Sequence, residues 1–144
     1  MTRVATQPDR GRERRVVPST NEGLTAPELL LVEDEPALQV VLRRYLEILG
    51  CRVTVAKDFD AAVDAVERVD GIFHRLVLDV HLPGGGGRRV YEYLRNARKE
   101  MTRGVIFITG GFTDATTEAF VRSTGRPVLM KPFDLRELDA AIRG

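Results

Sequence analysis

Hydrophobic and polar positions follow two periods that alternate along the chain. Short apolar runs are found at residues 28–34, 51–56, 73–80, 104–111 and 126–130. Between and after them, apolar residues recur at helical spacing over residues 38–49, 58–69, 88–99, 113–123 and 134–142. The run at 104–111 has no polar alternation, which is typical of a strand covered on both faces. The pattern therefore predicts five strands, each followed by a helix.

Regular alternation of this kind predicts an α/β fold with a doubly wound parallel sheet. Parallel strands need crossover connections, and these are right-handed, so the helices cover both faces of the sheet. The first helix is expected to stop at Gly50. The last helix has a clear start, with Asp134 as N-cap and Glu137 three positions later, as in a capping box. Phe133 and Leu138 are placed to form a hydrophobic staple around it.

The first 27 residues differ from the rest of the chain. They are rich in Arg, Pro, Thr, Ser and Gly and show no apolar period. Such a segment cannot bury enough apolar surface to offset the entropy lost on ordering. We therefore expect residues 1–27 to be a disordered tail or linker and residues 28–144 to form one domain. The Arg-rich stretch at 10–15 is either solvated or a contact with an anionic surface.

Composition and charge exclude several classes of protein. The 144 residues carry a formal net charge of +1, and residues 28–144 hold 17 basic against 18 acidic side chains. This balance gives no electrostatic footprint for nucleic acid. The apolar runs are too short to span a bilayer, and the N-terminus lacks the apolar core of a secretory signal. Cys51 is the only cysteine, which fits a reducing compartment, so we expect a cytoplasmic protein.

Polar side chains follow four of the five expected strands where each strand ends. Glu33 and Asp34 end the first strand, Asp79 the third, Thr109 the fourth and Lys131 the fifth. The carboxyl ends of parallel strands lie at one edge of the sheet, which is where doubly wound folds bind ligands. We therefore expect three acids, a hydroxyl and an ammonium to converge there. Solvated turn residues are the simpler interpretation of the acids, but it leaves this coincidence unexplained.

The expected constellation suits phosphoryl chemistry. Three facing carboxylates repel one another unless a cation or a proton lies between them, and a site with oxygen ligands only favours Mg²⁺. Asp79 is at the middle of the sheet and could act as a nucleophile, since aspartate forms acyl phosphates. Lys131 and the hydroxyl of Thr109 could then neutralise the oxygens of the phosphoryl group.

The chain from Leu29 to the C-terminus resembles a receiver domain of the two-component response-regulator family. The stretches that carry the resemblance are LLLVEDE, LVLDVHLPGGGG, VIFITG and VLMKPF. The second of them fits the family pattern D-x-x-[ML]-P-x-x-x-G. These four separated stretches lie in a resemblance that covers about four-fifths of the chain. The resemblance implies a flavodoxin-like sheet with the strand order 2-1-3-4-5. The stretches TGG and GRPVLMKPF resemble receivers attached to hybrid histidine kinases more than receivers of DNA-binding regulators.

The resemblance also implies a role for each site residue. Asp79 would be the phosphoacceptor. Asp34 and Asp79 would bind Mg²⁺ directly, Glu33 would act through water, and the backbone carbonyl of His81 would supply a further ligand. The side chain of His81, a lone histidine, is not expected to bind the metal.

Thr109 and Lys131 would hold the phosphoryl oxygens, and the bond between Lys131 and Pro132 would be cis. The phosphoryl group would come from a histidine kinase or a histidine phosphotransfer domain. The domain would catalyse only its own phosphorylation and dephosphorylation, so we do not expect a turnover enzyme. The sequence does not identify the partner kinase, the oligomeric state, or whether the chain is a stand-alone receiver or part of a hybrid kinase.

Val128 departs from the family pattern. Receivers usually have Tyr or Phe three residues before the lysine, and this ring moves inward when the threonine moves toward the phosphoryl group. A valine has no ring to relocate, so we expect either a weak response around the fourth helix on phosphorylation or a domain that mainly passes the phosphoryl group onward. Large chemical-shift changes at Val128 and over residues 114–121 would contradict this expectation.

Two other functions are possible for such a constellation, a phosphohydrolase and a module that only contacts other proteins. A phosphohydrolase with an aspartyl nucleophile would need a D-x-D pair on the first strand, and Pro36 stands where the second acid would be. A receiver-like module that works only through protein contacts would normally have lost one of Asp79, Thr109 or Lys131. All three are present, so a phosphoacceptor is the favoured function and the contact module its alternative.

Overall fold

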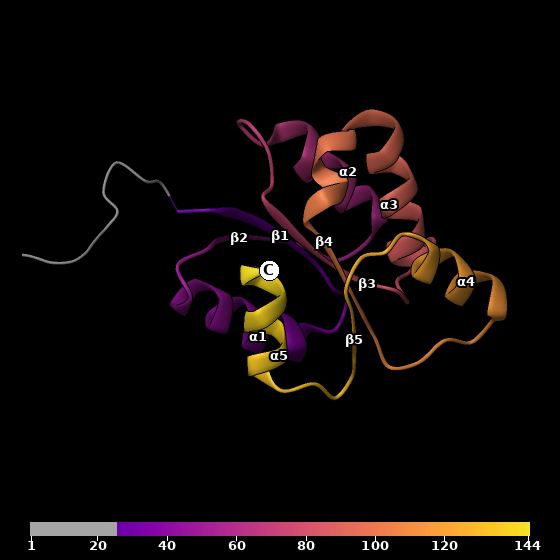
Figure 1. Cartoon of the computed structure of the whole chain (residues 1–144). Helices are drawn as coiled ribbons and strands as arrows, with labels where there is room; N and C mark the ends of the chain where they lie inside the picture. The colour runs from indigo at the N-terminus through magenta and orange to yellow at the C-terminus, as the bar shows by residue number, and fades with distance from the viewer. Residues whose placement is uncertain (1–25) are drawn as a thin grey trace, which may run out of the picture.

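Five parallel strands form one sheet in the order β2-β1-β3-β4-β5. The computed structural model describes residues 26–144 (Figure 1). The strands are β1 (Glu28–Val32), β2 (Arg52–Ala56), β3 (Arg75–Asp79), β4 (Val105–Thr109) and β5 (Val128–Met130). The helices are α1 (Pro36–Ile48), α2 (Phe59–Arg68), α3 (Gly86–Ala97), α4 (Ala115–Ser123) and α5 (Leu135–Arg143), with a 3-10 helix, η2 (Lys99–Gly104), after α3.

Helices cover both faces of this sheet. In Figure 1, α1 and α5 lie on one side, and α2, α3 and α4 lie on the other. Each layer has its own core, because alternate residues of the central strands point to opposite faces. On β4, Val105 and Phe107 pack toward α2, α3 and α4, whereas Ile106 and Ile108 pack toward α1 and α5. The doubly wound fold and the strand order expected from the sequence are confirmed.

Aspartates begin three of the helices. Asp58, Asp114 and Asp134 each accept a hydrogen bond from the backbone N–H three residues later, at 2.8, 2.7 and 2.9 Å. These bonds satisfy N–H groups that have no partner within the helix. The N-cap expected at Asp134 is thereby confirmed. Phe133 and Leu138 pack in the same core, as expected for the staple.

The largest departure from the sequence pattern lies around α3. Helix α3 begins at Gly86, two residues earlier than expected, and ends at Ala97. The chain then forms η2, whose residues 100–103 the sequence pattern assigns to no element. Its sequence, KEMTRG, has a single large apolar side chain, that of Met101, and therefore shows no period. Residues 1–25 of the expected N-terminal tail lie outside the described residues.

The strand order places the sheet's switch point between β1 and β3. Strand β1 pairs with β2 on one side and with β3 on the other. The connections that leave β1 and β3 therefore run to opposite faces, which opens a crevice at their carboxyl ends. Glu33 and Asp34 directly follow β1, and Asp79 is the last residue of β3. The fold thus brings these acids to the crevice.

Among the four glycines of the GGGG loop, Gly86 is the one whose replacement would disturb the backbone of the loop most. Its φ is +68°, and a Cβ atom there would lie 1.8 Å from the carbonyl oxygen of Val80. Gly84 also has a positive φ, of +82°, but its nearest neighbour would be the guanidinium of Arg89 at 3.9 Å. The two glycines therefore share a left-handed backbone and differ in the space around them.

We expect Gly86→Ala to lower the free energy of unfolding by about 2 to 5 kcal/mol, the sum of left-handed strain and a backbone clash. Gly84→Ala is the matched control and should lose only about 1 to 2 kcal/mol, from the strain alone. Urea unfolding of both variants measures the difference. Equal losses would show that the contact with Val80 does not constrain the loop.

Candidate functional site

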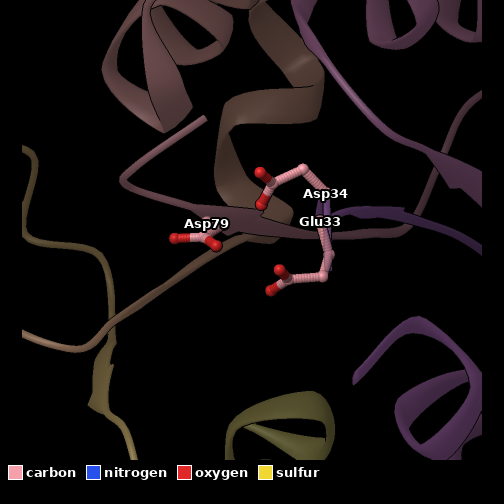
Figure 2. Close-up of side chains that lie close together, drawn as sticks. All are labelled: Glu33, Asp34 and Asp79. Carbon is pink, nitrogen blue, oxygen red and sulfur yellow. The ribbon is translucent and has the colours of Figure 1, made fainter. Parts of the chain in front are cut away.

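Three acidic side chains converge at the carboxyl ends of β1 and β3. Glu33, Asp34 and Asp79 each place a carboxylate oxygen within 4.8 Å of the other two. Figure 2 shows the side chains of Glu33 and Asp34 extending from consecutive residues, with their carboxylates on the side of Asp79. Glu33 and Asp79 are buried, whereas Asp34 is exposed. The convergence expected from the strand ends is therefore present for all three acids.

Glu33 is held by hydrogen bonds at every polar group. Its backbone N–H donates to the carbonyl of Ala56, and its own carbonyl accepts from the side-chain amide of Gln39. One carboxylate oxygen accepts from the N–H of Glu35 at 3.0 Å, and the other accepts from Lys131 at 3.2 Å. Both carboxylate oxygens of Glu33 therefore already have a partner within the described residues.

Lys131 links two of the acids. Its ammonium nitrogen lies 3.0 Å from an oxygen of Asp79 and 3.2 Å from an oxygen of Glu33. The side chains of Glu33 and Asp79 are only 1% and 5% exposed, so this ammonium is their main neutralising charge within the described residues. These two contacts show that Lys131 lies beside the acids at the carboxyl ends of the strands, as expected from the sequence.

The pKa values of Lys131 and Glu33 reflect this arrangement. Partial burial lowers the pKa of Lys131, but the hydrogen bond and charge of Asp79, followed by those of Glu33, outweigh it and raise the pKa above its ordinary value. Burial raises the pKa of Glu33, and the charge of Asp79 adds to this rise. The N–H of Glu35 and the ammonium act in the opposite direction without cancelling it. The ammonium of Lys131 therefore compensates the negative charge of the buried site only in part.

Thr109 lies at the end of β4 with a fully buried side chain. Its hydroxyl donates to the carbonyl of Gly111 at 2.8 Å and accepts from the N–H of the same residue at 3.1 Å. A ring nitrogen of His81 is also within hydrogen-bond distance of the Gly111 carbonyl. The loop after β4 therefore occupies the hydroxyl of Thr109, which must rotate away before it can donate to another group.

The donor set fits a hard divalent cation. Carboxylate oxygens are the side-chain ligands offered, and three carboxylates against one ammonium leave an excess of negative charge. The carboxylate of Asp34 accepts no hydrogen bond from the part of the chain that the structure describes, so its oxygens are available. The N–H of His81 donates to an oxygen of Asp79 at 3.0 Å, which fixes the backbone of this residue beside the acids. The ring of His81 turns to Gly111 instead.

Val128 packs in the core on the same side of the sheet as Phe107, its partner on β4. It is half-buried and fills this position as an ordinary aliphatic residue. The peptide bond between Lys131 and Pro132 is cis, as expected. Gln39, which holds the Glu33 carbonyl, was not anticipated from the sequence. A polar residue in the first turns of an amphipathic helix gives no signal that separates it from a solvated one.

Comparison with protein families matches residues 29–143 to the family described as the response regulator receiver domain. The transcriptional activator protein PfeR of Pseudomonas aeruginosa is 36% identical over 117 residues, which cover 81% of this chain and 37% of PfeR. The transcriptional regulatory protein TcrA of Mycobacterium tuberculosis is 38% identical over 117 residues, which cover 80% of this chain and 44% of TcrA. The chain therefore spans less than half the length of these curated relatives.

Solved structures show the same fold. A CheY-like receiver domain protein from Methanospirillum hungatei superposes with a TM-score of 0.73 at 24% identity, covering 83% of this chain and 92% of that one. The receiver domain of the sensor histidine kinase PA1611 from Pseudomonas aeruginosa has a TM-score of 0.71 at 28% identity. It covers 83% of this chain and 96% of that one, and its structure contains a magnesium ion coordinated in the active site cleft.

Proposed function

Because the chain belongs to the receiver-domain family of two-component response regulators, we propose that Asp79 accepts a phosphoryl group from a phosphohistidine. The donor is a histidine kinase or a histidine phosphotransfer domain in the cytoplasm. The observation that carries the proposal is the environment of Asp79, a buried carboxylate paired with Lys131 at the switch point of the sheet. The site resembles a transfer site because an ammonium and two further acids surround one potential nucleophile.

Mg²⁺ is the proposed cofactor. Asp34 and Asp79 would hold it directly, Glu33 would act through water, and the carbonyl of His81 would complete the protein ligands. When bound, the cation supplies positive charge to the transferring phosphoryl group. The proposal is supported by the excess negative charge of the cluster and by the magnesium ion in the receiver domain of PA1611.

The chain's own residues divide the work of transfer. An oxygen of Asp79 attacks phosphorus while the bond from phosphorus to the donor's imidazole nitrogen breaks, and the electron pair stays on that nitrogen. Lys131 is proposed to move its hydrogen bond from the carboxylate to a phosphoryl oxygen, which offsets the charge brought to the site. Thr109 would exchange its bond to Gly111 for a second phosphoryl oxygen. We propose that the domain catalyses only this transfer and the later hydrolysis, without turnover of an external substrate.

An apolar groove beside Lys131 supports a protein as the donor. It has a volume of about 510 Å³ and lies between α1 and the loop after β5. Val41 is half exposed on its α1 wall, and Phe133 and Leu135 form the opposite side. A donor that presents an apolar surface here would bring its histidine to the edge of the site. The weak response of α4 expected from Val128 stays a prediction.

Acetyl phosphate offers a direct test of the acceptor chemistry. Incubation with it should add one phosphoryl group per chain in the presence of Mg²⁺ and none in excess EDTA, because the cluster needs the cation to admit a phosphoryl dianion. Intact-mass measurement gives the stoichiometry. A folded protein that binds Mg²⁺ and takes up no phosphoryl group would favour the alternative, a receiver-like module that acts through protein contacts alone.

A further inference from the structure

A hollow of about 470 Å³ opens at the edge of the sheet, between β2 and α2. Glu28, the first residue of β1, lines it, so it lies at the opposite end of this strand from Glu33. Strand β2 ends the sheet order, and no further strand of the described residues covers this side. The floor of the hollow is apolar, because Phe73 is buried there and Ala65 and Val69 pack against the same core. We call this hollow the α2 groove.

Helix α2 gives the groove a negative wall. Among the five α-helices in the described part of the chain, only α2 has more acids than bases. Its Asp60, Asp64 and Glu67 are four and three residues apart, so they lie on one face of the helix. Asp64 lines the groove, and so does Asp70, which follows the helix. Residues 57–70 together carry five acids against two bases.

The bases that line the groove are already paired. Arg68 lies 2.9 Å from Asp64, and Arg52 lies 3.0 Å from Glu28. The exposed acids of this region that form no ion pair within residues 26–144 are Asp60, Glu67 and Asp70. The groove therefore keeps an excess of negative charge that the described residues do not neutralise.

The chain enters the sheet at one wall of this groove. The carbonyl of Pro27 accepts a hydrogen bond from the N–H of Arg52 at 2.8 Å, and Glu28 follows. Residues 10–17 (RGRERRVV) lie shortly before this point and carry four arginines, one acid and two valines. Pro27 is ten residues after Val17, a stretch that can span up to about 33 Å, whereas α2, with ten residues, is about 15 Å long. The segment therefore reaches every part of the groove.

We propose that residues 10–17 bind the α2 groove of their own chain. The arginines would pair with Asp64, Glu67 and Asp70, and Val16 and Val17 would lie on the apolar floor. A guanidinium presents parallel N–H groups that match a carboxylate. Because the segment is tethered, its effective concentration at the groove is roughly millimolar, so weak contacts are enough to populate the bound state.

Two features favour α2 over the acid cluster as the partner of this segment. The cluster lies past the far end of β1, and the ammonium of Lys131 already offsets part of its charge. The α2 groove adjoins Pro27 and offers an apolar floor as well as carboxylates. Docking there leaves the phosphoacceptor open, so the contact is a further property of the chain and is independent of transfer to Asp79.

Limited digestion of the full chain with trypsin tests the contact. The bonds Arg3–Val4 and Arg15–Val16 join the same two residue types, but only the second lies in the segment proposed to dock. Cleavage of a docked bond requires release, so its rate follows the released population. The ratio of the two cleavage rates, measured by intact mass, therefore reports docking within one sample.

Removal of carboxylates from the groove should release the segment. Asp64→Asn and Asp70→Asn should each raise the cleavage rate after Arg15 by about two- to threefold, as for the loss of one surface ion pair. The double variant should raise it by about four- to tenfold, because the two losses add in free energy. The cleavage rate after Arg3 should stay at the wild-type value in all three variants.

Asp139→Asn is the matched control. Asp139 pairs with Arg143 at 2.7 Å across one helical turn, as Asp64 does with Arg68 at 2.9 Å. It belongs to α5, on the opposite face of the sheet from α2 (Figure 1). Its replacement should leave both cleavage rates unchanged, and circular dichroism checks that every variant is folded.

Three results would overturn the proposal. An unchanged cleavage rate after Arg15 in the double variant would show that α2 does not hold the segment. Equal acceleration by Asp139→Asn would assign the effect to net charge. If the wild-type ratio of cleavage after Arg15 to cleavage after Arg3 rises on about tenfold dilution, the segment binds a neighbouring copy instead of its own chain.

Discussion

Replacing Asp79 with Asn is expected to reduce phosphoryl uptake from acetyl phosphate at least about a hundredfold, because it removes the nucleophile itself. The fold should survive, since asparagine is close in size and Lys131 keeps its contact with Glu33 at 3.2 Å. Phos-tag electrophoresis and intact mass measure the uptake. Circular dichroism confirms that the variant is folded.

A matched control excludes nonspecific phosphorylation of carboxylates. Asp70 is an exposed acid that precedes β3, at the opposite end of this strand from Asp79, and Asp70→Asn should be phosphorylated like the wild type. Uptake by Asp79→Asn at the wild-type level would mean that another group accepts the phosphoryl. Asp34 and His81 would be the first residues to consider, because both lie beside Asp79.

Lys131→Met should have the largest effect on stability, in addition to its effect on transfer. In the absence of Mg²⁺ the variant leaves Glu33 and Asp79 facing each other without the ammonium. Removing one partner of a buried ion pair costs about 3 to 5 kcal/mol. Phosphoryl uptake should fall about a hundred- to a thousandfold, as for the loss of an oxyanion-binding donor. Urea unfolding in EDTA and the rate of phosphorylation give the two numbers.

The pH dependence of this loss has a definite sign. Burial and the charge of Asp79 already raise the pKa of Glu33 above its ordinary value, and removal of the Lys131 ammonium, which acts in the opposite direction, should raise it further. An acid with a raised folded pKa favours the folded state when it is protonated, so the stability lost by the variant should grow as the pH rises through that folded pKa. Added Mg²⁺ should restore part of it by replacing the missing positive charge.

Lys57→Met controls for the removal of a lysine. Lys57 is exposed and is not a partner in any ion pair of the described residues, so its replacement should change stability by less than about 0.5 kcal/mol. If Lys131→Met is no less stable than Lys57→Met at neutral pH, the ammonium does not compensate the buried acids. The electrostatic role proposed for Lys131 in the site would then be wrong.

The sequence predicted the fold well because the fold depends on repeating local signals. Runs such as VIFIT in β4, with both faces buried, alternate with helices whose starts carry Asp58, Asp114 and Asp134 as caps. Parallel strands place their carboxyl ends at one edge, so Asp79 and Lys131 could be assigned to one site from their positions alone. Such inferences require only the order and direction of the strands.

Contacts that depend on side-chain conformation could not be predicted in this way. The bond from Gln39 to the Glu33 carbonyl and the turn of the Thr109 hydroxyl toward Gly111 each require known rotamers and loop geometry. The early start of α3 was missed because two glycines in a first turn argue against a helix on propensity. The hollow of about 460 Å³ between Asp34, His81 and Arg88 arises only when the start of α4 is placed against the loop after β3.

Locating the modified residue tests the central claim most directly. After incubation with acetyl phosphate and Mg²⁺, borohydride reduction converts an aspartyl phosphate to homoserine, and fragment mass spectra identify its position. The account predicts homoserine at residue 79 alone, and only in samples that contained Mg²⁺. Homoserine at another position, or none in a sample whose intact mass shows a phosphoryl group, would contradict it.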